Sequence, residues 1–297
     1  MPWEEARPEA GTRKYTVAMI LSSGFSGMFS SSNHGALWAA SLSALAAYAA
    51  AGLLRDSTGA WPRRALLLAW LVHAAAIVLD IAGFGSPLPG ARFGFATALS
   101  ATSWLVLAVY AVESRWVPLP GVRRALALLG AVAVVLAAVF PGEFRPQAAS
   151  HWAPLHWALG IASYGLFGSA VLHAVMLDAA ERRMRLTKSQ AMPAASHGMP
   201  LLRLERLTFQ FVAAGFALLS ATLVLGWWFA NPWRWDHKTV FSMLGWVVFA
   251  GLLVGRQTLG WRGRSAIRWL YAGAALLLLA YVGSRFMLEV VLQRPLH

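Results

Sequence analysis

The most distinctive stretch of the chain is a cluster of tryptophans beside charged side chains, between Gly226 and Lys238. Four tryptophans fall within nine residues, more than the interfacial aromatic belt of a membrane protein requires. Indole rings stack on flat aromatic molecules, and basic side chains bind carboxylates. The predicted stacking surface consists of Trp227, Trp228, Trp233 and Trp235. Its predicted polar contacts are Arg234, Asp236 and Lys238. An interfacial belt without a ligand is the alternative.

A histidine stands ahead of small residues at helical spacing in the segment that begins at His156. Gly160 and Ser163 follow it by four and seven residues, which places them on the same helix face. Small residues let another helix, or a flat macrocycle, approach the backbone. For these two residues helix packing is the simpler interpretation. For His156 the sequence alone leaves a ligand role and a packing role open.

Three further histidines occupy less informative positions. His73 lies near the middle of an apolar run, where a ligand, an interhelical hydrogen bond or a proton relay are all open. Asp80 shares its helix face but lies about 10 Å away by helical rise, so the two do not pair directly. His173 lies about 25 Å from His156 by the same rise, and we expect it to pack at the inner membrane boundary. His237 falls within the tryptophan cluster and is a candidate second ligand.

The elements that position these residues are apolar runs long enough to cross about 30 Å of hydrocarbon. Uninterrupted runs of this length satisfy their backbone groups in lipid as helices, and Pro and Gly punctuate the gaps. We therefore predict an all-α, polytopic membrane bundle with eight spans. The predicted spans are Gly35–Leu54, Arg64–Phe84, Phe93–Val112, Val122–Phe140, Leu155–Asp178, Thr208–Phe229, Thr239–Gly255 and Ala266–Leu288.

Composition supports a membrane protein and excludes other classes. The chain of 297 residues is 58% hydrophobic and only 12% charged, about half the charge of a soluble domain. Its net charge of +13 is spread in short clusters between apolar runs, which indicates membrane topology rather than nucleic-acid binding. Cysteine is absent, so a thiol redox pair and a covalent haem attachment motif are both excluded.

The distribution of Lys and Arg predicts the orientation of the bundle. Alternate loops carry 16 basic residues on one side of the membrane and 9 on the other. Because basic loops stay inside, both termini are predicted to lie outside, in the periplasm of a Gram-negative cell. Residues 35–290 form the single predicted membrane domain. Residues 1–34 are expected to be a disordered tail, with Met19 as an alternative start, and residues 291–297 a short C-terminal tail.

Several motifs in the second half of the chain resemble the cytochrome c assembly family of CcsA- and CcmC-like membrane proteins. The run from Trp233 to Lys238, followed by Trp246, is similar to the tryptophan-rich signature of that family. His156 with Ser163-Tyr164 resembles its His-x6-Ser-Tyr segment.

Two later motifs resemble the small eight-helix branch of that family, which contains HemX- and YpjD-like proteins. They are Gly260-Trp-Arg-Gly-Arg264 and Ala280-Tyr-Val-Gly-Ser-Arg285. The resemblance covers about residues 140–290.

The resemblance implies a bacterial inner-membrane protein that binds haem non-covalently between the outer end of the fifth span and the tryptophan-rich loop. His156 would be the axial ligand of the haem iron, and His73 is a candidate second ligand. Haem, the lipid bilayer and other cytochrome c maturation membrane proteins are the expected partners.

Departures from the family pattern argue against a complete haem-attachment enzyme, so we expect a binding protein without catalytic activity. Thr239 stands where a Glu usually follows the signature, and no His matches the one expected after Arg285. Arg256 occupies a position where the family often has His. Guanidinium cannot donate a lone pair to iron, so Arg256 is expected to pair with an anion or extend to the membrane surface.

A transporter of a small solute or ion, or its accessory subunit, is the alternative function. Asp80 and His73 within the membrane favour it. The absence of paired carboxylates and of interrupted half-helices at the midplane weighs against it.

Overall fold

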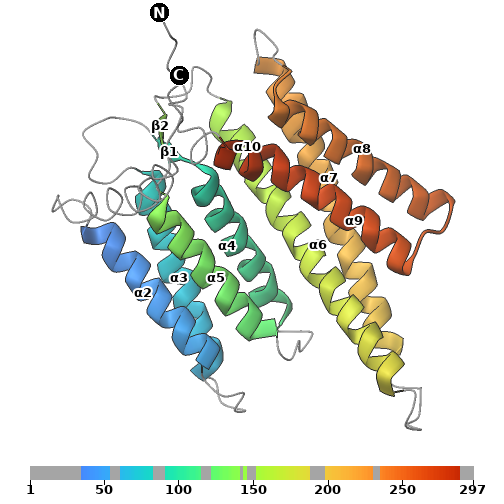
Figure 1. The fold of residues 1–297 in the computed structure, drawn as a ribbon, viewed down its shortest axis with the longest axis horizontal. Coiled ribbons are helices and arrows are strands. Elements are labelled where there is room, and N and C mark those ends of the chain that lie inside the picture. Colours follow the sequence, from blue (N-terminus) through green and yellow to red (C-terminus); the bar gives the residue numbers. More distant parts are fainter. Residues whose placement is uncertain are drawn as a thin grey trace, which may run out of the picture.

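The computed structural model describes residues 35–53, 61–82, 91–114, 122–140, 143–145, 152–187, 198–229 and 235–287. These residues form long helices and one short pair of strands (Figure 1). The elements are α2 (Gly35–Leu53), α3 (Trp61–Ile81), β1 (Ala91–Phe93), α4 (Phe95–Glu113), α5 (Val122–Val139), β2 (Glu143–Arg145), α6 (Ala153–Thr187), α7 (Gly198–Phe229), α8 (His237–Thr258), α9 (Gly263–Leu278), the π-helix η3 (Leu279–Gly283) and α10 (Ser284–Phe286).

The prediction of eight membrane spans is confirmed. Among the described residues, eight helices are long and apolar enough to cross a bilayer, with mean hydropathy between 1.5 and 2.1. The eighth span runs through α9, η3 and α10 without a break, over Gly263–Phe286. Large apolar side chains such as Leu71, Val78 and Val247 lie exposed on the outer faces, which suits contact with lipid. The chain is a polytopic membrane protein. The predicted tails, residues 1–34 and 291–297, lie outside the described residues.

Two helices extend beyond the apolar runs that predicted them. α6 was expected over Leu155–Asp178 and continues to Thr187, while α7 was expected from Thr208 and begins at Gly198. The added turns contain Glu, Arg, Leu and Met, which favour helix without being apolar enough to count as a span. Hydropathy therefore marked the part of each helix inside the membrane rather than the whole helix.

A short antiparallel pair of strands was not predicted. β1 pairs with β2, with Ala91 opposite Arg145 and Phe93 opposite Glu143. The third span was predicted to begin at Phe93, but Phe93 ends β1, and α4 begins at Phe95 after the extended Gly94. Strands of three residues are too short for a periodic pattern to reveal them. The pair matters for function because it places Phe93 beside α6.

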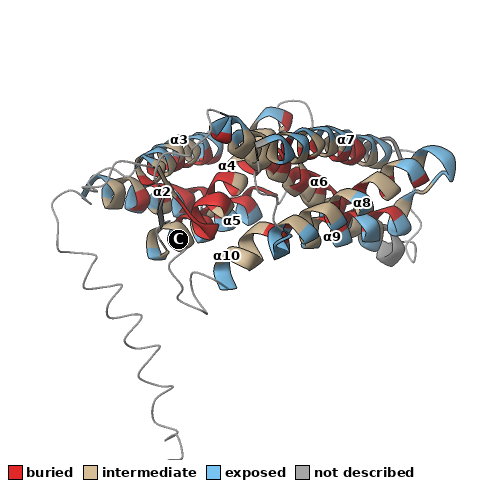
Figure 2. Cartoon of the chain, turned by 90° about the horizontal axis from the view of Figure 1, so that it is seen from above, coloured by how far each residue is buried: buried red, intermediate tan, exposed pale blue. Residues whose placement is uncertain are grey.

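The bundle consists of two halves, α2–α5 and α6–η3, and each has its own buried core. Figures 1 and 2 show the halves side by side, with buried residues facing inward between the helices. Contacts between α4 and α6 join them. Met176 of α6 packs against both cores, so α6 is the structural link between the halves.

The motif that begins at Gly260 is the turn between α8 and α9. Gly260 and Gly263 have φ of 64° and 60°, in the left-handed region that favours glycine. Trp261 between them folds back onto α8, where its ring contacts the backbone of Gly255. This turn explains why the sequence needs two glycines around a tryptophan.

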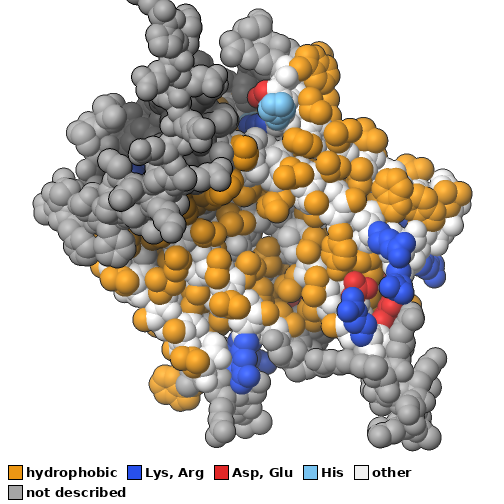
Figure 3. Space-filling model, in the orientation of Figure 1, with side chains coloured by type: hydrophobic (Ala, Val, Ile, Leu, Met, Phe, Trp, Pro, Cys, Tyr) orange, Lys and Arg blue, Asp and Glu red, His pale blue; other side chains and the backbone are white. Residues whose placement is uncertain are grey.

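The surface in Figure 3 is mostly apolar across the middle of the molecule. The Lys and Arg side chains drawn on that face gather mainly toward the end opposite the β1–β2 pair. Charged ends around an apolar girdle are the surface expected of a bundle embedded in a bilayer.

Candidate functional site

His156 lies in the first turn of α6, at the end of the helix near the β1–β2 pair. Its half-buried imidazole shares a hydrogen bond with the backbone of Thr222 on α7. Gly226, one turn further along α7, leaves the space that the ring occupies. A Cβ at Gly226 would lie only 2.9 Å from Cε1 of His156. α7 therefore holds His156 in place with one hydrogen bond and one missing side chain.

His156 lines a cavity with a volume of about 340 Å³. This falls within the usual range for small-molecule sites, roughly 300–1,000 Å³. Side chains from both halves of the bundle line it. They include Ala98 and Thr102 of α4, Trp157 and Tyr164 of α6, Thr222 of α7, and Ser242 of α8.

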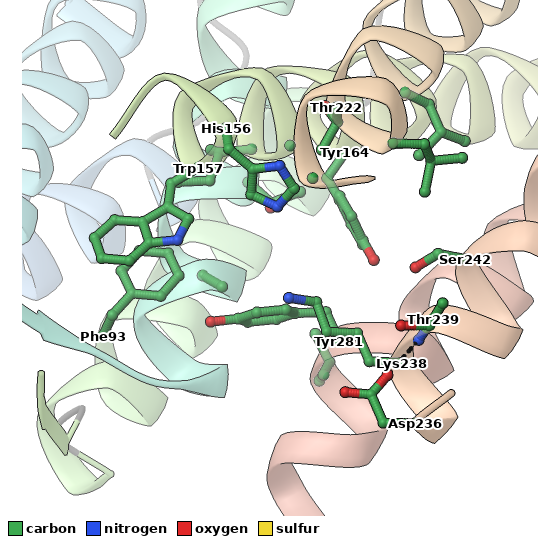
Figure 4. A pocket seen from close by; sticks show the side chains of 18 residues that line it. Phe93, His156, Trp157, Tyr164, Thr222, Asp236, Lys238, Thr239, Ser242 and Tyr281 are labelled. Carbon is green, nitrogen blue, oxygen red and sulfur yellow. Dashed lines mark hydrogen bonds between the residues drawn. The ribbon is translucent and has the colours of Figure 1, made fainter. Parts of the chain in front are cut away.

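Aromatic rings form one wall of this cavity (Figure 4). Phe93 of β1 stacks on Trp157 of α6, with ring centroids 5.7 Å apart and planes 10° from parallel. Tyr281 meets Phe93 edge-on at 6.0 Å. Three elements that are distant in sequence thus build a continuous aromatic surface beside His156.

Two cations and a carboxylate lie next to this wall. The Lys238 ammonium is 5.5 Å from the Tyr281 ring centroid, and the Arg285 guanidinium is 5.9 Å from it. Asp236 accepts a hydrogen bond of 2.8 Å from the Thr239 N–H and so caps the N-terminus of α8. Asp236 and Lys238 both line the cavity. The cavity therefore combines an aromatic surface with one ammonium and one carboxylate group in its lining, and Arg285 lies close to Tyr281.

The π-helix η3 contributes Tyr281 to this aromatic wall. π-helices are rare and occur frequently at functional sites. η3 presents Tyr281 and Val282 to the cavity, and it follows Leu277, whose carbonyl accepts a 2.5 Å hydrogen bond from the Tyr164 hydroxyl. Tyr164 ties α6 to the turn that precedes η3. Sequence reasoning placed Tyr164 and Tyr281 only in family-like motifs and did not foresee that they share a cavity.

The predicted site residues are only partly brought together. His156, Asp236 and Lys238 line one cavity. Trp227, Trp228 and Trp235 are 67%, 77% and 69% exposed, and the cavity is lined without them. Trp233 and Arg234 lie outside the described residues. The aromatic lining of the cavity comes instead from Phe93, Trp157, Tyr164 and Tyr281. The predicted Trp stacking surface stays a prediction.

His73 lies elsewhere, buried in the other half of the bundle. Its Nδ1 is 2.8 Å from the Tyr48 hydroxyl and its Nε2 is 2.8 Å from the Ser100 hydroxyl. Both ring nitrogens are therefore engaged between helices. Of the alternatives for His73, this geometry favours interhelical hydrogen bonding over a ligand role. His237 is exposed in the first turn of α8 and does not line the cavity.

Arg256 and His173 do not line this cavity. Arg256 pairs with Glu205 at 3.1 Å and lies over the Phe209 ring, which confirms that it pairs with an anion. His173 was expected to pack at the inner membrane boundary, and the structure shows that it is buried. Its Nδ1 donates to the Ser169 carbonyl at 2.7 Å, and its Nε2 lies 2.7 Å from a Glu113 carboxylate oxygen. Both side chains are therefore engaged in contacts within the bundle.

The eight-helix fold and its histidine-lined cavity can be compared with known proteins. The family model described as cytochrome C assembly protein matches residues 61–292. The chain is 31% identical over 254 residues to the inner membrane protein YpjD of Escherichia coli K12, covering 81% of this chain and 92% of that protein.

Two further relatives are similar to this chain. An uncharacterized 28.8 kDa protein of Azospirillum brasilense is 29% identical, over 82% of this chain and 90% of that protein. A cytochrome c biogenesis protein CcsA of Prochlorococcus marinus is 23% identical, over 62% of this chain and 69% of that protein. No solved structure matches the chain significantly. On the family match and the YpjD similarity, the chain belongs to the cytochrome c assembly protein family.

Proposed function

We propose that this protein binds haem in the 340 Å³ cavity and takes part in cytochrome c biogenesis. Family membership and the similarity to CcsA proteins support the biological role. The position of His156 supports the site most directly, because it brings an imidazole to an aromatic cavity with Lys238 in its lining. The protein would act by binding and presenting haem rather than by catalysing a reaction.

The residues of the cavity fit haem in three respects. Neutral imidazole is a standard ligand of haem iron, and the bond to the Thr222 backbone orients the ring as a second hydrogen bond does for many metal-bound histidines. The walls of Phe93, Trp157 and Tyr281 suit a flat aromatic macrocycle. Lys238, on the rim of the cavity, is placed to bind carboxylates.

The chemistry of the chain also limits how haem can be held. The sequence contains no cysteine, so no thioether bond to this chain can form. The haem would be bound non-covalently, as in a b-type protein. Bound haem supplies the iron that His156 would ligate. We propose that the protein then transfers this reversibly bound haem to other maturation proteins of the membrane.

Absorption spectroscopy of the full-length protein tests this function. The protein purified in detergent is expected to show a Soret band, or to develop one on titration with haemin to about one equivalent. An apolar cavity that binds a macrocycle through an imidazole should saturate at a defined stoichiometry. A colourless protein that takes up no haemin beyond a detergent blank would contradict the proposal.

We further propose that the protein lies in the bacterial inner membrane with both termini and the haem cavity facing outward. The bias of 16 basic residues against 9 supports this orientation. Alkaline phosphatase is active only outside the cytoplasm. Fusions after Arg145 and Arg294 are expected to be active, and a fusion after Lys188 inactive. Activity at Lys188 would reverse the orientation and place the cavity on the inner side.

A further inference from the structure

A second cavity lies within the α2–α5 half of the bundle, separate from the proposed haem site. Its volume is about 20 Å³, enough for one water molecule. Its polar lining comes from Ser41, His73, Asp80, Thr97 and Ser100, and apolar residues of α2, α3 and α5 complete it. A cavity this small with several polar partners is of the kind that holds ordered water.

Asp80 is the residue of this cavity that most requires a further partner. It is 4% exposed, and its Oδ2 accepts a 2.8 Å hydrogen bond from the Thr97 hydroxyl. Its Oδ1 is buried and accepts no hydrogen bond from the described part of the protein. Burying a carboxylate oxygen without a hydrogen-bond donor is energetically costly. A small hydrogen-bond donor in the cavity, or a proton on Oδ1, removes that cost.

His73 forms the other polar end of the cavity, between the hydroxyls of Tyr48 and Ser100. A neutral imidazole carries one N–H, so it donates one of these two hydrogen bonds and accepts the other. If Nδ1 donates to Tyr48, Ser100 donates to Nε2. The reverse arrangement is equally satisfied. Changing from one arrangement to the other transfers a proton from one side of the imidazole to the other. Tyr48, His73 and Ser100 can therefore relay a proton.

The surrounding charges show which small ligand suits Asp80. Arg92 of β1 acts on the carboxylate electrostatically. The other elements supply Tyr48 and Ser41 from α2, Thr97 and Ser100 from α4, and only apolar side chains from α5. His73 is the titratable group on the same helix. A volume of 20 Å³ leaves no room for a hydrated metal cation, whereas a proton on a carboxylate oxygen needs no extra room. Size therefore favours a proton over a metal cation.

We propose that Asp80 is a proton-binding site, linked through a water molecule in the cavity to Ser100 and His73. Oδ1 takes the proton from the aqueous phase, and Oδ2 remains the carbonyl oxygen that accepts from Thr97. Beyond Tyr48 lie the apolar buried residues Ala51, Leu66 and Leu126, and the buried Arg123, which donates a hydrogen bond to the Ala51 carbonyl.

Infrared difference spectra of the full-length protein, recorded between high and low pH, test this proposal. Lowering the pH is expected to produce the C=O band of a neutral carboxyl group, and Asp80→Asn is expected to remove it. Asp178→Asn is the matched control, because Asp178 lies on another membrane helix beside Tyr271. A band that survives Asp80→Asn, or no carboxyl band at all, would overturn the assignment.

A second variant decides the matter if Asp80→Asn does not fold. Thr97→Val removes the hydroxyl that donates to Oδ2, so the carboxyl band is expected to move to higher wavenumber. Thr208→Val is its control, because that buried hydroxyl donates to the Leu204 carbonyl instead. An unmoved band in Thr97→Val contradicts the proposal. So does a band that responds to added Na⁺ at constant pH, which would make the site a cation site.

Discussion

Replacing His156 with alanine is expected to remove most of the haem that the purified protein carries, whereas His73→Ala removes little. His156 is the imidazole in the large cavity, while both nitrogens of His73 are occupied by Tyr48 and Ser100. Loss of an outer hydrogen-bond partner of a metal ligand lowers affinity by roughly 10- to 100-fold, so losing the ligand itself should cost at least about tenfold. The pyridine haemochrome assay gives the haem-to-protein ratio of each variant.

His237→Ala is the control for this comparison, since His237 is an exposed histidine just beyond the cavity. Its haem content should match that of the unmodified protein. His73→Ala loses two buried hydrogen bonds, worth about 1 kcal/mol each, and leaves a void. The ratio is therefore measured on the monodisperse fraction alone. The opposite result, in which His73→Ala loses haem and His156→Ala retains it, would make His73 the principal ligand. It would refute the proposed haem site in the cavity lined by His156.

Much of the architecture could be predicted from the sequence because lipid imposes a simple rule. Each span must bury its backbone polar groups within itself, so an uninterrupted apolar run such as Val122–Phe140 is a helix wherever it packs. The resulting α5 ends at Val139, one residue from the prediction. Features that depend on contacts between distant segments were not predictable in this way. β1 and β2 are three residues each, and η3 looks like ordinary apolar helix in sequence.

The same distinction applies to the candidate site. Residue type identified His156, Asp236 and Lys238, because imidazole, carboxylate and ammonium groups near an apolar run are rare. The residue types alone did not show in which direction the tryptophan side chains point. Trp228 is 77% exposed, while Trp157, one residue after His156, forms the wall with Phe93. Phe93 lies 64 positions before Trp157, and the β1–β2 pair and the packing of α4 on α6 hold this part of the chain beside it.

Gly226→Ala is expected to weaken haem binding although Gly226 offers no ligand of its own. The added Cβ would lie 2.9 Å from Cε1 of His156, so the imidazole must move away from its hydrogen bond with Thr222. Displacing an oriented ligand should lower haem affinity by roughly 10- to 100-fold. Forcing a group into this packed turn should also destabilise the fold by about 1–3 kcal/mol. Haemin titration and thermal unfolding measure the two effects.

Gly251→Ala is the matched control, since a Cβ there meets nothing within 4 Å on the described residues. It should leave haem binding unchanged and, as Ala favours helix over Gly, raise stability by up to about 1 kcal/mol. The double variant Gly226→Ala/His156→Ala identifies the cause. With the imidazole gone the methyl group has space, so Gly226→Ala should cost little stability in that background. An undiminished cost there would mean that Gly226 serves α7 packing alone and does not position His156.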